Sequence, residues 1–140
     1  TDPRGPVISV AYFALLPRKS LKIKNISEIQ EPTFFPVTKL PKLAFNHQLI
    51  FDYGLKRLRA KLEYTNIIYS LLPKEFTFNQ LQKTYELVLN KTFDKRNFRK
   101  KFMALDLIKP TKKILKGIRQ RPAKLYTFAS KKLTELAKFF

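Results

Sequence analysis

The spacing of apolar residues predicts two helices in the middle of the chain. In residues 46–63, apolar side chains recur at intervals of four, three and four positions, which places them on one face of a helix; they are Phe51, Leu55, Leu58 and Leu62. Asn46 is placed to cap the first turn, and basic residues gather near the last turn, where the helix dipole favours cations. A second, shorter helix is expected over residues 64–72, because Pro73 would end it.

Two further helices are expected as a helix-turn-helix unit. Thr77 and Gln80 form the capping box T-x-x-Q, which opens a helix that runs to about Leu89. The apolar face of this helix consists of Phe78, Leu81, Tyr85 and Val88. After a short turn at residues 90–93, Asp94 caps a basic helix, although a functional acid is the other interpretation of this residue.

The basic helix has two different sides. Its apolar side is formed by Phe98, Phe102 and Leu105, and its opposite side by Arg96, Arg99, Lys100 and Met103. A helix held to a core by the first set must point the second set away from it. This is the pattern of a recognition helix, in which Met103 is either a base contact or part of the core edge.

Extended segments are expected on both sides of these helices. Residues 7–16 (VISVAYFALL) suit a strand covered on both faces, and a buried helix fits the same pattern. Residues 34–37 are the best candidate for a short strand in a region broken by prolines. Residues 107–111 and 123–128 read as two strands joined by a basic loop around Gly117, which is the arrangement of a wing. A final helix is expected over residues 130–140, with Leu133, Leu136 and Phe140 on one face.

The charge of the chain changes what these elements suggest. The net charge is +19 over 140 residues, and residues 64–140 contain 18 of the 29 basic side chains against 5 of the 10 acidic ones. A positive field concentrated in the second half attracts phosphate backbones. The alternative, a solvated lysine-rich surface, fits the composition equally well, but not the coincidence of charge, helix order and wing.

The candidate nucleic-acid contacts follow from this arrangement. Guanidinium and ammonium groups neutralise phosphates, and arginine can also bond two acceptors of a guanine edge. We expect groove contacts from Arg96, Arg99 and Lys100. We expect phosphate contacts from Thr77, Asn79, Gln80, Lys95, Lys112, Lys113, Lys116, Arg119 and Arg121.

Catalytic and metal-binding patterns are poorly represented. The sequence has no cysteine, no H-E-x-x-H motif and no phosphate-cradling glycine loop. His47 is the single histidine and reads as a structural or surface residue. The apolar run at residues 7–16 is about half of a bilayer span, so no membrane partner is expected, and the absence of cysteine favours a cytoplasmic location.

Two regions of the sequence resemble a known family. Residues 71–108 and 119–128 (RQRPAKLYTF) closely resemble the C-terminal winged-helix domain of the Nudix-related transcriptional regulators of NAD metabolism. Residues 1–16 and 34–65 are similar to the last part of the Nudix domain that precedes it. The resemblance implies an α+β chain, with a partial Nudix-type α/β fold in residues 1–63 and a winged helix-turn-helix DNA-binding domain in residues 64–140.

The resemblance also implies a function. It indicates a repressor that binds double-stranded DNA as a homodimer near genes of NAD or sugar metabolism, with ADP-ribose or a related nucleotide as the effector sensed by the Nudix part. The Nudix box, a glycine followed by a glutamate-rich helix that holds Mg²⁺, is not among these residues. We therefore expect no enzyme activity and no cofactor in this chain, whereas an intact Nudix domain would take Mg²⁺ and ADP-ribose.

Two other functions remain as alternatives. The intact polypeptide could be a Nudix pyrophosphatase acting on ADP-ribose, in which this half is accessory structure and the catalytic box lies outside the chain. A third interpretation is a protein-interaction module, because winged helices also bind proteins.

Overall fold

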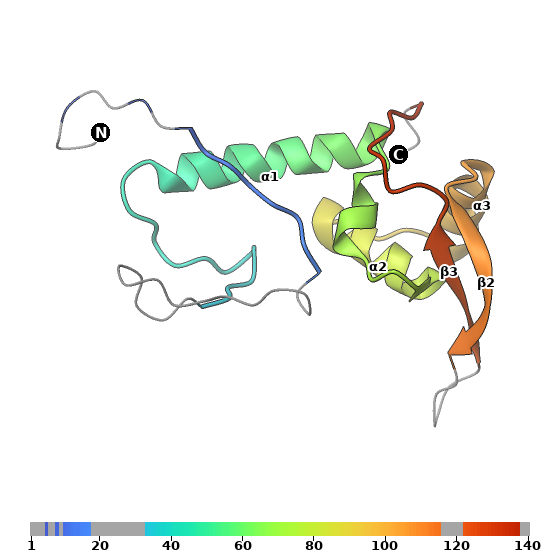
Figure 1. The fold of residues 1–140 in the computed structure, drawn as a ribbon. Coiled ribbons are helices and arrows are strands. Elements are labelled where there is room, and N and C mark those ends of the chain that lie inside the picture. The colour runs from blue at the N-terminus through green and yellow to red at the C-terminus, as the bar shows by residue number, and fades with distance from the viewer. Residues whose placement is uncertain (1–4, 6–7, 9, 18–32, 116–121, 138–140) are drawn as a thin grey trace.

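The computed structural model describes residues 5, 8, 10–17, 33–115 and 122–137. In chain order the elements are α1 (His47–Tyr64), the 3-10 helix η2 (Ile67–Leu71), β1 (Phe76–Thr77), α2 (Phe78–Leu89), α3 (Lys95–Ala104), β2 (Ile108–Leu115) and β3 (Ala123–Phe128). Figure 1 shows α1 as a long rod, with the later elements gathered at its C-terminal end and the described residues before it running beside it without regular structure. The mixture of helices and a small antiparallel sheet confirms the expected α+β class.

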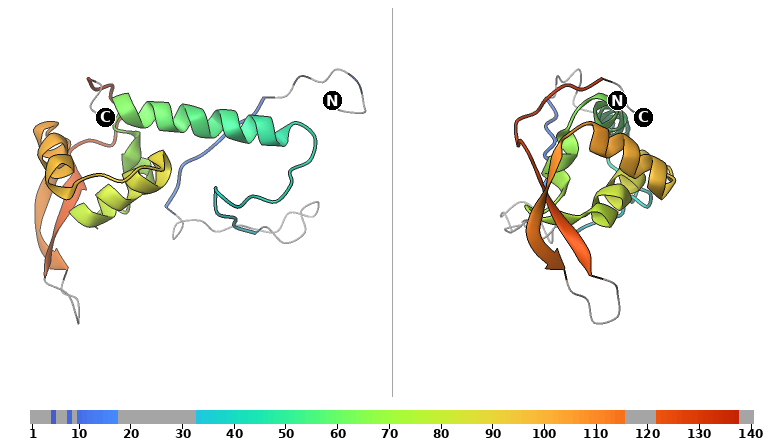
Figure 2. Two further views of the ribbon diagram at one scale, coloured as in Figure 1. Left: turned by 180° about the vertical axis from the view of Figure 1, so that it is seen from behind. Right: turned by 90° about the vertical axis from the view of Figure 1, so that its right-hand side faces the viewer.

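The sheet has the strand order β1-β3-β2, and both pairings are antiparallel. β3 is the central strand, and its Tyr126 lies opposite Phe76 of β1 and Pro110 of β2. The register between β2 and β3 shifts between Pro110 and Ile114. A proline is tolerated there because β2 is an edge strand. Figure 2 shows the β2–β3 hairpin extending away from the helices, as expected for a wing.

An aromatic core holds the helices to the sheet. Phe76, Tyr85 and Phe102 are fully buried, and Phe98 is 2% exposed. The ring of Tyr85 meets those of Phe98 and Phe102 edge to face at centroid distances of 5.6 and 5.7 Å. Burying such a side chain stabilises the fold by about 1.5–3 kcal/mol, and an edge-to-face pair adds about 0.5–1.5 kcal/mol. The apolar faces predicted for α2 and α3 are therefore confirmed.

The predicted helix over residues 46–63 is confirmed as α1, with two differences. Asn46 occupies the N-cap position, but its side chain makes no capping hydrogen bond. Leu62 is the only fully buried residue of α1, and it belongs to the aromatic core. The C-terminal end of α1 is thus part of the same packing unit as α2 and α3.

The predicted helix over residues 64–72 is only partly correct. Thr65 leaves the helical conformation with φ −137° and ψ 165°, and its hydroxyl donates to the Lys61 carbonyl at 2.7 Å. α1 ends at Tyr64, the Asn66 N–H donates to the Thr134 carbonyl instead of to the helix, and only the short 3-10 helix η2 follows. Local hydrogen bonding by threonine competes with helix continuation in this way.

The final helix expected over residues 130–140 is wrong for residues 130–137, and residues 138–140 lie outside the described part. This segment runs extended across the junction between α1 and η2. The Asn66 amide donates to the Lys132 carbonyl and accepts from the Thr134 N–H, both at 2.8 Å, and the Leu136 N–H donates to the Tyr64 carbonyl at 2.7 Å. The backbone of the segment finds its partners there, so helical bonding is not needed.

The two strands predicted near the start of the chain are also wrong for the described residues. Ile8, residues 10–16 and residues 34–37 form neither strand nor helix, and Ile8 and Tyr12 are 98% and 92% exposed. A strand requires a hydrogen-bonded neighbour, and in the described part of the chain none pairs with these residues. Within the described ranges, none of the helices combines the length and apolar character that a bilayer crossing needs.

Candidate nucleic-acid interface

The N-terminus of α2 is built by the predicted capping box. The Gln80 N–H donates to the Thr77 hydroxyl at 3.2 Å, and the Thr77 N–H donates to the Gln80 side-chain oxygen at 2.7 Å. Thr77 is 7% exposed, so its hydroxyl serves the cap, while Asn79 and Gln80 lie on the surface. By helix geometry the N–H group of Asn79 has no acceptor within α2, and it lies at the positive end of the helix dipole.

A hydrogen-bonded turn sets the angle between α2 and α3. Asn90 takes the left-handed conformation (φ 53°, ψ 44°) that ends α2. One Glu86 carboxylate oxygen accepts from the Phe93 N–H and from the Gln82 amide, both at 3.0 Å, and the same Gln82 amide donates to the Phe93 carbonyl at 2.9 Å. The Phe93 N–H, followed by the Gln82 amide, lowers the pKa of Glu86 below its ordinary value.

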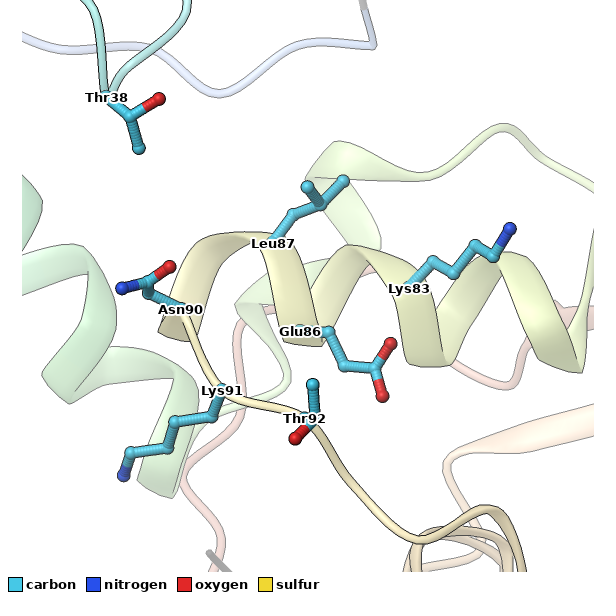
Figure 3. Close-up of a pocket in the computed structure, with 7 residues that line it drawn as sticks. All are labelled: Thr38, Lys83, Glu86, Leu87, Asn90, Lys91 and Thr92. Atoms are coloured by element: carbon cyan, nitrogen blue, oxygen red, sulfur yellow. The ribbon is translucent and has the colours of Figure 1, made fainter.

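Figure 3 shows the open hollow beside this turn, into which Glu86 points from α2. Its volume is about 810 Å³, and it is lined by Thr38, Lys83, Glu86, Leu87, Asn90, Lys91 and Thr92. Because the Glu86 carboxylate already receives two hydrogen bonds, we assign it to the turn and not to a catalytic function.

The basic helix α3 has the orientation that its sequence predicts. Asp94 caps it, because its carboxylate accepts from the Asn97 N–H at 2.9 Å. Phe98 and Phe102 are buried, and all five cations of α3 are exposed: Lys95, Arg96, Arg99, Lys100 and Lys101. Met103 is 40% exposed and lies on the open side of the helix. The described cations of α3 therefore face solvent together on a helix anchored by aromatic side chains.

Arg99 is held differently from the other cations of α3. Its guanidinium carbon lies 4.8 Å above the Phe78 ring, and its Nη2 donates to the Tyr126 hydroxyl at 2.9 Å. Arg99 thus contacts both α2 and β3. This contact could not be predicted from sequence patterns, because Phe78, Arg99 and Tyr126 are far apart along the chain.

The wing provides some of the predicted cations. Lys112 and Lys113 are exposed on β2, and the Lys113 ammonium pairs with Glu75 at 3.0 Å. Lys116, Arg119 and Arg121 lie outside the described residues. Sequence reasoning missed Lys124, which is exposed on β3. The period of two along a strand could not have marked it as exposed, since it places Lys124 on the same face as the buried Tyr126.

A hollow of about 460 Å³ joins these elements. Its lining residues come from the start of α2, from α3 and from both wing strands; they are Thr77, Phe78, Asn79, Gln80, Arg99, Leu115, Ala123, Lys124 and Tyr126. Two of them are cations and none is a carboxylate. The start of α2 adds the positive end of a helix dipole. The arrangement favours an anionic ligand.

Comparison with known proteins agrees with this geometry. The family model of the NrtR DNA-binding winged helix domain matches residues 68–128. The ADPR responsive transcriptional repressor NtrR of Acinetobacter baylyi is 35% identical over 130 residues, which cover 91% of this chain and 51% of that protein. The chain therefore spans about half the length of this curated relative.

Two solved structures are also similar. Shewanella oneidensis NrtR complexed with a 27mer DNA matches with a TM-score of 0.56 and 32% identity over 66% of this chain and 41% of that one. A second crystal structure of Shewanella oneidensis NrtR matches with a TM-score of 0.59 and 29% identity over 74% of this chain and 47% of that one. Residues 68–128 are thus an NrtR-type winged-helix domain, and most of the chain is similar to NrtR proteins.

Proposed function

We propose that this chain is the DNA-binding part of a transcriptional regulator and that it binds double-stranded DNA through α3, the start of α2 and the wing. The observation that carries the proposal is the exposed cationic side of α3, anchored by the buried Phe98 and Phe102. The similar Shewanella protein crystallised with DNA and the similar Acinetobacter repressor support the same function.

The contacts divide into two groups. Arg96 and Lys100 lie four residues apart on the open side of α3, and we assign them to the major groove. We assign the exposed Asn79, Lys95, Lys112 and Lys113 to phosphates. Thr77 and Gln80 contribute chiefly by holding the start of α2 in place, since their side chains bond each other's backbone.

We further propose that residues 1–63 belong to a Nudix-like unit and residues 64–140 to the winged-helix unit. The Acinetobacter relative is ADPR responsive, so we infer that ADP-ribose or a related nucleotide controls DNA binding here as well. We also propose a homodimer that acts as a repressor in the cytoplasm. The Arg59 side chain, which donates from α1 to the Val88 carbonyl of α2 at 2.9 Å, is a direct link between the two units.

Fluorescence anisotropy tests the DNA proposal. A duplex is first enriched from a randomised pool by the wild-type chain, and a scrambled duplex of equal composition serves as the reference. Arg96→Ala is expected to weaken binding to the enriched duplex by about 1–3 kcal/mol and to relax selectivity at one base position. Lys56→Ala, an exposed cation on α1, is the matched control and should bind as the wild type does.

Salt gives an independent test. If each protomer neutralises about four phosphates, the logarithm of affinity should fall with the logarithm of salt concentration with a slope near −4 per protomer. A flat salt response, or equal binding of the enriched and scrambled duplexes, would contradict sequence-specific DNA binding.

A further inference from the structure

Arg99 lies on the recognition helix, but its side chain is fixed sideways against the sheet. The Tyr126 hydroxyl accepts from Nη2 at 2.9 Å, and the guanidinium carbon lies 6.0 Å from the Tyr126 ring centroid. On the other side it stacks 4.8 Å above the Phe78 ring. The guanidinium has five N–H donors, and the bond to Tyr126 uses one of them.

Tyr126 is a rigid anchor for this contact. It is 4% exposed, and it sits on the central strand, opposite Phe76 and Pro110. Its ring also meets the Phe78 ring edge to face at 6.0 Å. The position of its hydroxyl is therefore set by the core, and Arg99 loses much of its conformational freedom before any ligand binds. Such preorganisation increases affinity by lowering the entropic cost of binding.

The anchored guanidinium lines the 460 Å³ hollow together with Lys124 and the start of α2. A phosphodiester group suits this site, because the two cations and the positive end of the α2 dipole both stabilise a negative charge. A base edge suits it less well. Base edges lie in the groove, which Arg96 and Lys100 are placed to enter, whereas Arg99 is drawn toward β3.

We propose that Tyr126 holds Arg99 as a phosphate-binding arm at the mouth of this hollow, with Lys124 as the second cation, and that Arg99 does not read bases. This proposal rests on the proposed DNA binding and deepens it. Tyr126 is a positioning residue, since it acts through Arg99. The role first predicted for Arg99, a groove contact, is replaced by a contact to the backbone of the nucleic acid.

Tyr126→Phe tests the anchor because it removes one oxygen and keeps the ring. The full chain is titrated with the enriched and the scrambled duplex. We expect affinity for both duplexes to fall by the same factor, about fivefold, while the thermal midpoint moves by only a few degrees. Arg99→Ala is expected to weaken both duplexes equally, by about tenfold, and to reduce the salt slope by about 1.

Coupling between the two residues separates positioning from a merely structural role. In the Arg99→Ala background, Tyr126→Phe should cause no further loss of affinity, because the group it positions is gone. Arg57 and Tyr53 provide a matched control pair on α1, where the guanidinium carbon lies 5.8 Å from the ring centroid. Tyr53→Phe and Arg57→Ala should both bind DNA as the wild type does.

Each contrary result has one meaning. Wild-type affinity in Tyr126→Phe, or additive losses in the double variant, overturns the anchor. A loss of discrimination between the two duplexes in Arg99→Ala shows that Arg99 reads bases and overturns its phosphate role. A wild-type chain that binds no duplex overturns both this proposal and the proposed function, whereas normal wild-type binding with an unaffected Tyr126→Phe overturns this proposal alone.

Discussion

The winged-helix half and the residues before α1 contain similar aromatic residues but place them differently. Phe76 and Phe102 are fully buried, whereas Phe35 and Phe45 are 50% and 58% exposed. The hydrophobic effect is non-directional, so an apolar side chain is buried only where another surface covers it. In the winged-helix half the helices and the sheet cover each other. The described residues before α1 form no helix or strand of their own, and most of their large apolar side chains stay exposed.

This comparison indicates where the folding free energy of the chain resides. A single cluster contains all of the buried apolar side chains of the described residues, from Leu62 of α1 to Tyr126 of β3. The candidate nucleic-acid interface lies directly on this cluster. Phe98 and Phe102 anchor α3 in it, and Tyr126 of the cluster accepts a hydrogen bond from Arg99. A rigid interface is therefore expected.

The largest expected difference in stability is between two phenylalanine-to-alanine substitutions, one in each region. Phe102→Ala should lower the free energy of unfolding by about 4 kcal/mol, because it removes a fully buried ring and leaves a cavity. Phe35→Ala, at a site that is half exposed, should change it by less than about 0.5 kcal/mol. Urea unfolding followed by circular dichroism measures both. Equal losses of unfolding free energy would contradict the difference between the two regions and would place part of the core before α1.

A leucine pair on α1 locates the boundary between the two regions. Leu62→Ala is expected to cost about 3 kcal/mol, since Leu62 is fully buried near the C-terminal end of the helix. Leu49→Ala should be nearly neutral, since Leu49 is 69% exposed near the other end. The same urea experiment applies. Comparable losses at the two positions would mean that α1 is buried along its whole length and that the boundary lies earlier.

The smallest effect concerns the pH dependence of the turn between α2 and α3. Hydrogen bonds from the Phe93 N–H and the Gln82 amide lower the pKa of Glu86 from 4.5, so the folded chain binds this proton less readily than the unfolded chain does. The stability that the carboxylate contributes is complete above pH 4.5 and is lost as the pH falls through the lower native pKa.

Glu86→Gln tests this prediction, because the amide oxygen keeps an acceptor for the Phe93 N–H but does not titrate. Its thermal midpoint should depend less on pH below 4.5 than that of the wild type. Identical pH profiles for the two proteins would show that the Glu86 carboxylate adds nothing to the turn. The effect is expected to be small because the carboxylate is close to solvent.

The sequence alone determined the features that depend on neighbours three or four residues away. The capping box at Thr77 and Gln80, the Asp94 cap and the apolar faces of α2 and α3 were predicted and are confirmed. Caps and amphipathic faces are local, so their physical cause is visible in a short stretch of sequence. The outward orientation of the cations on α3 followed from the same pattern.

Only the tertiary structure decided the features that depend on a distant partner. The segment at residues 130–137 is extended because Asn66 and Tyr64 supply its hydrogen bonds, and residues 10–16 form no strand because no other segment pairs with them in the described part of the chain. Arg99 is fixed by Tyr126, 27 residues further along the chain. Pairing and burial require a second surface, and the sequence pattern of one segment shows that it needs such a surface but not which one it will meet.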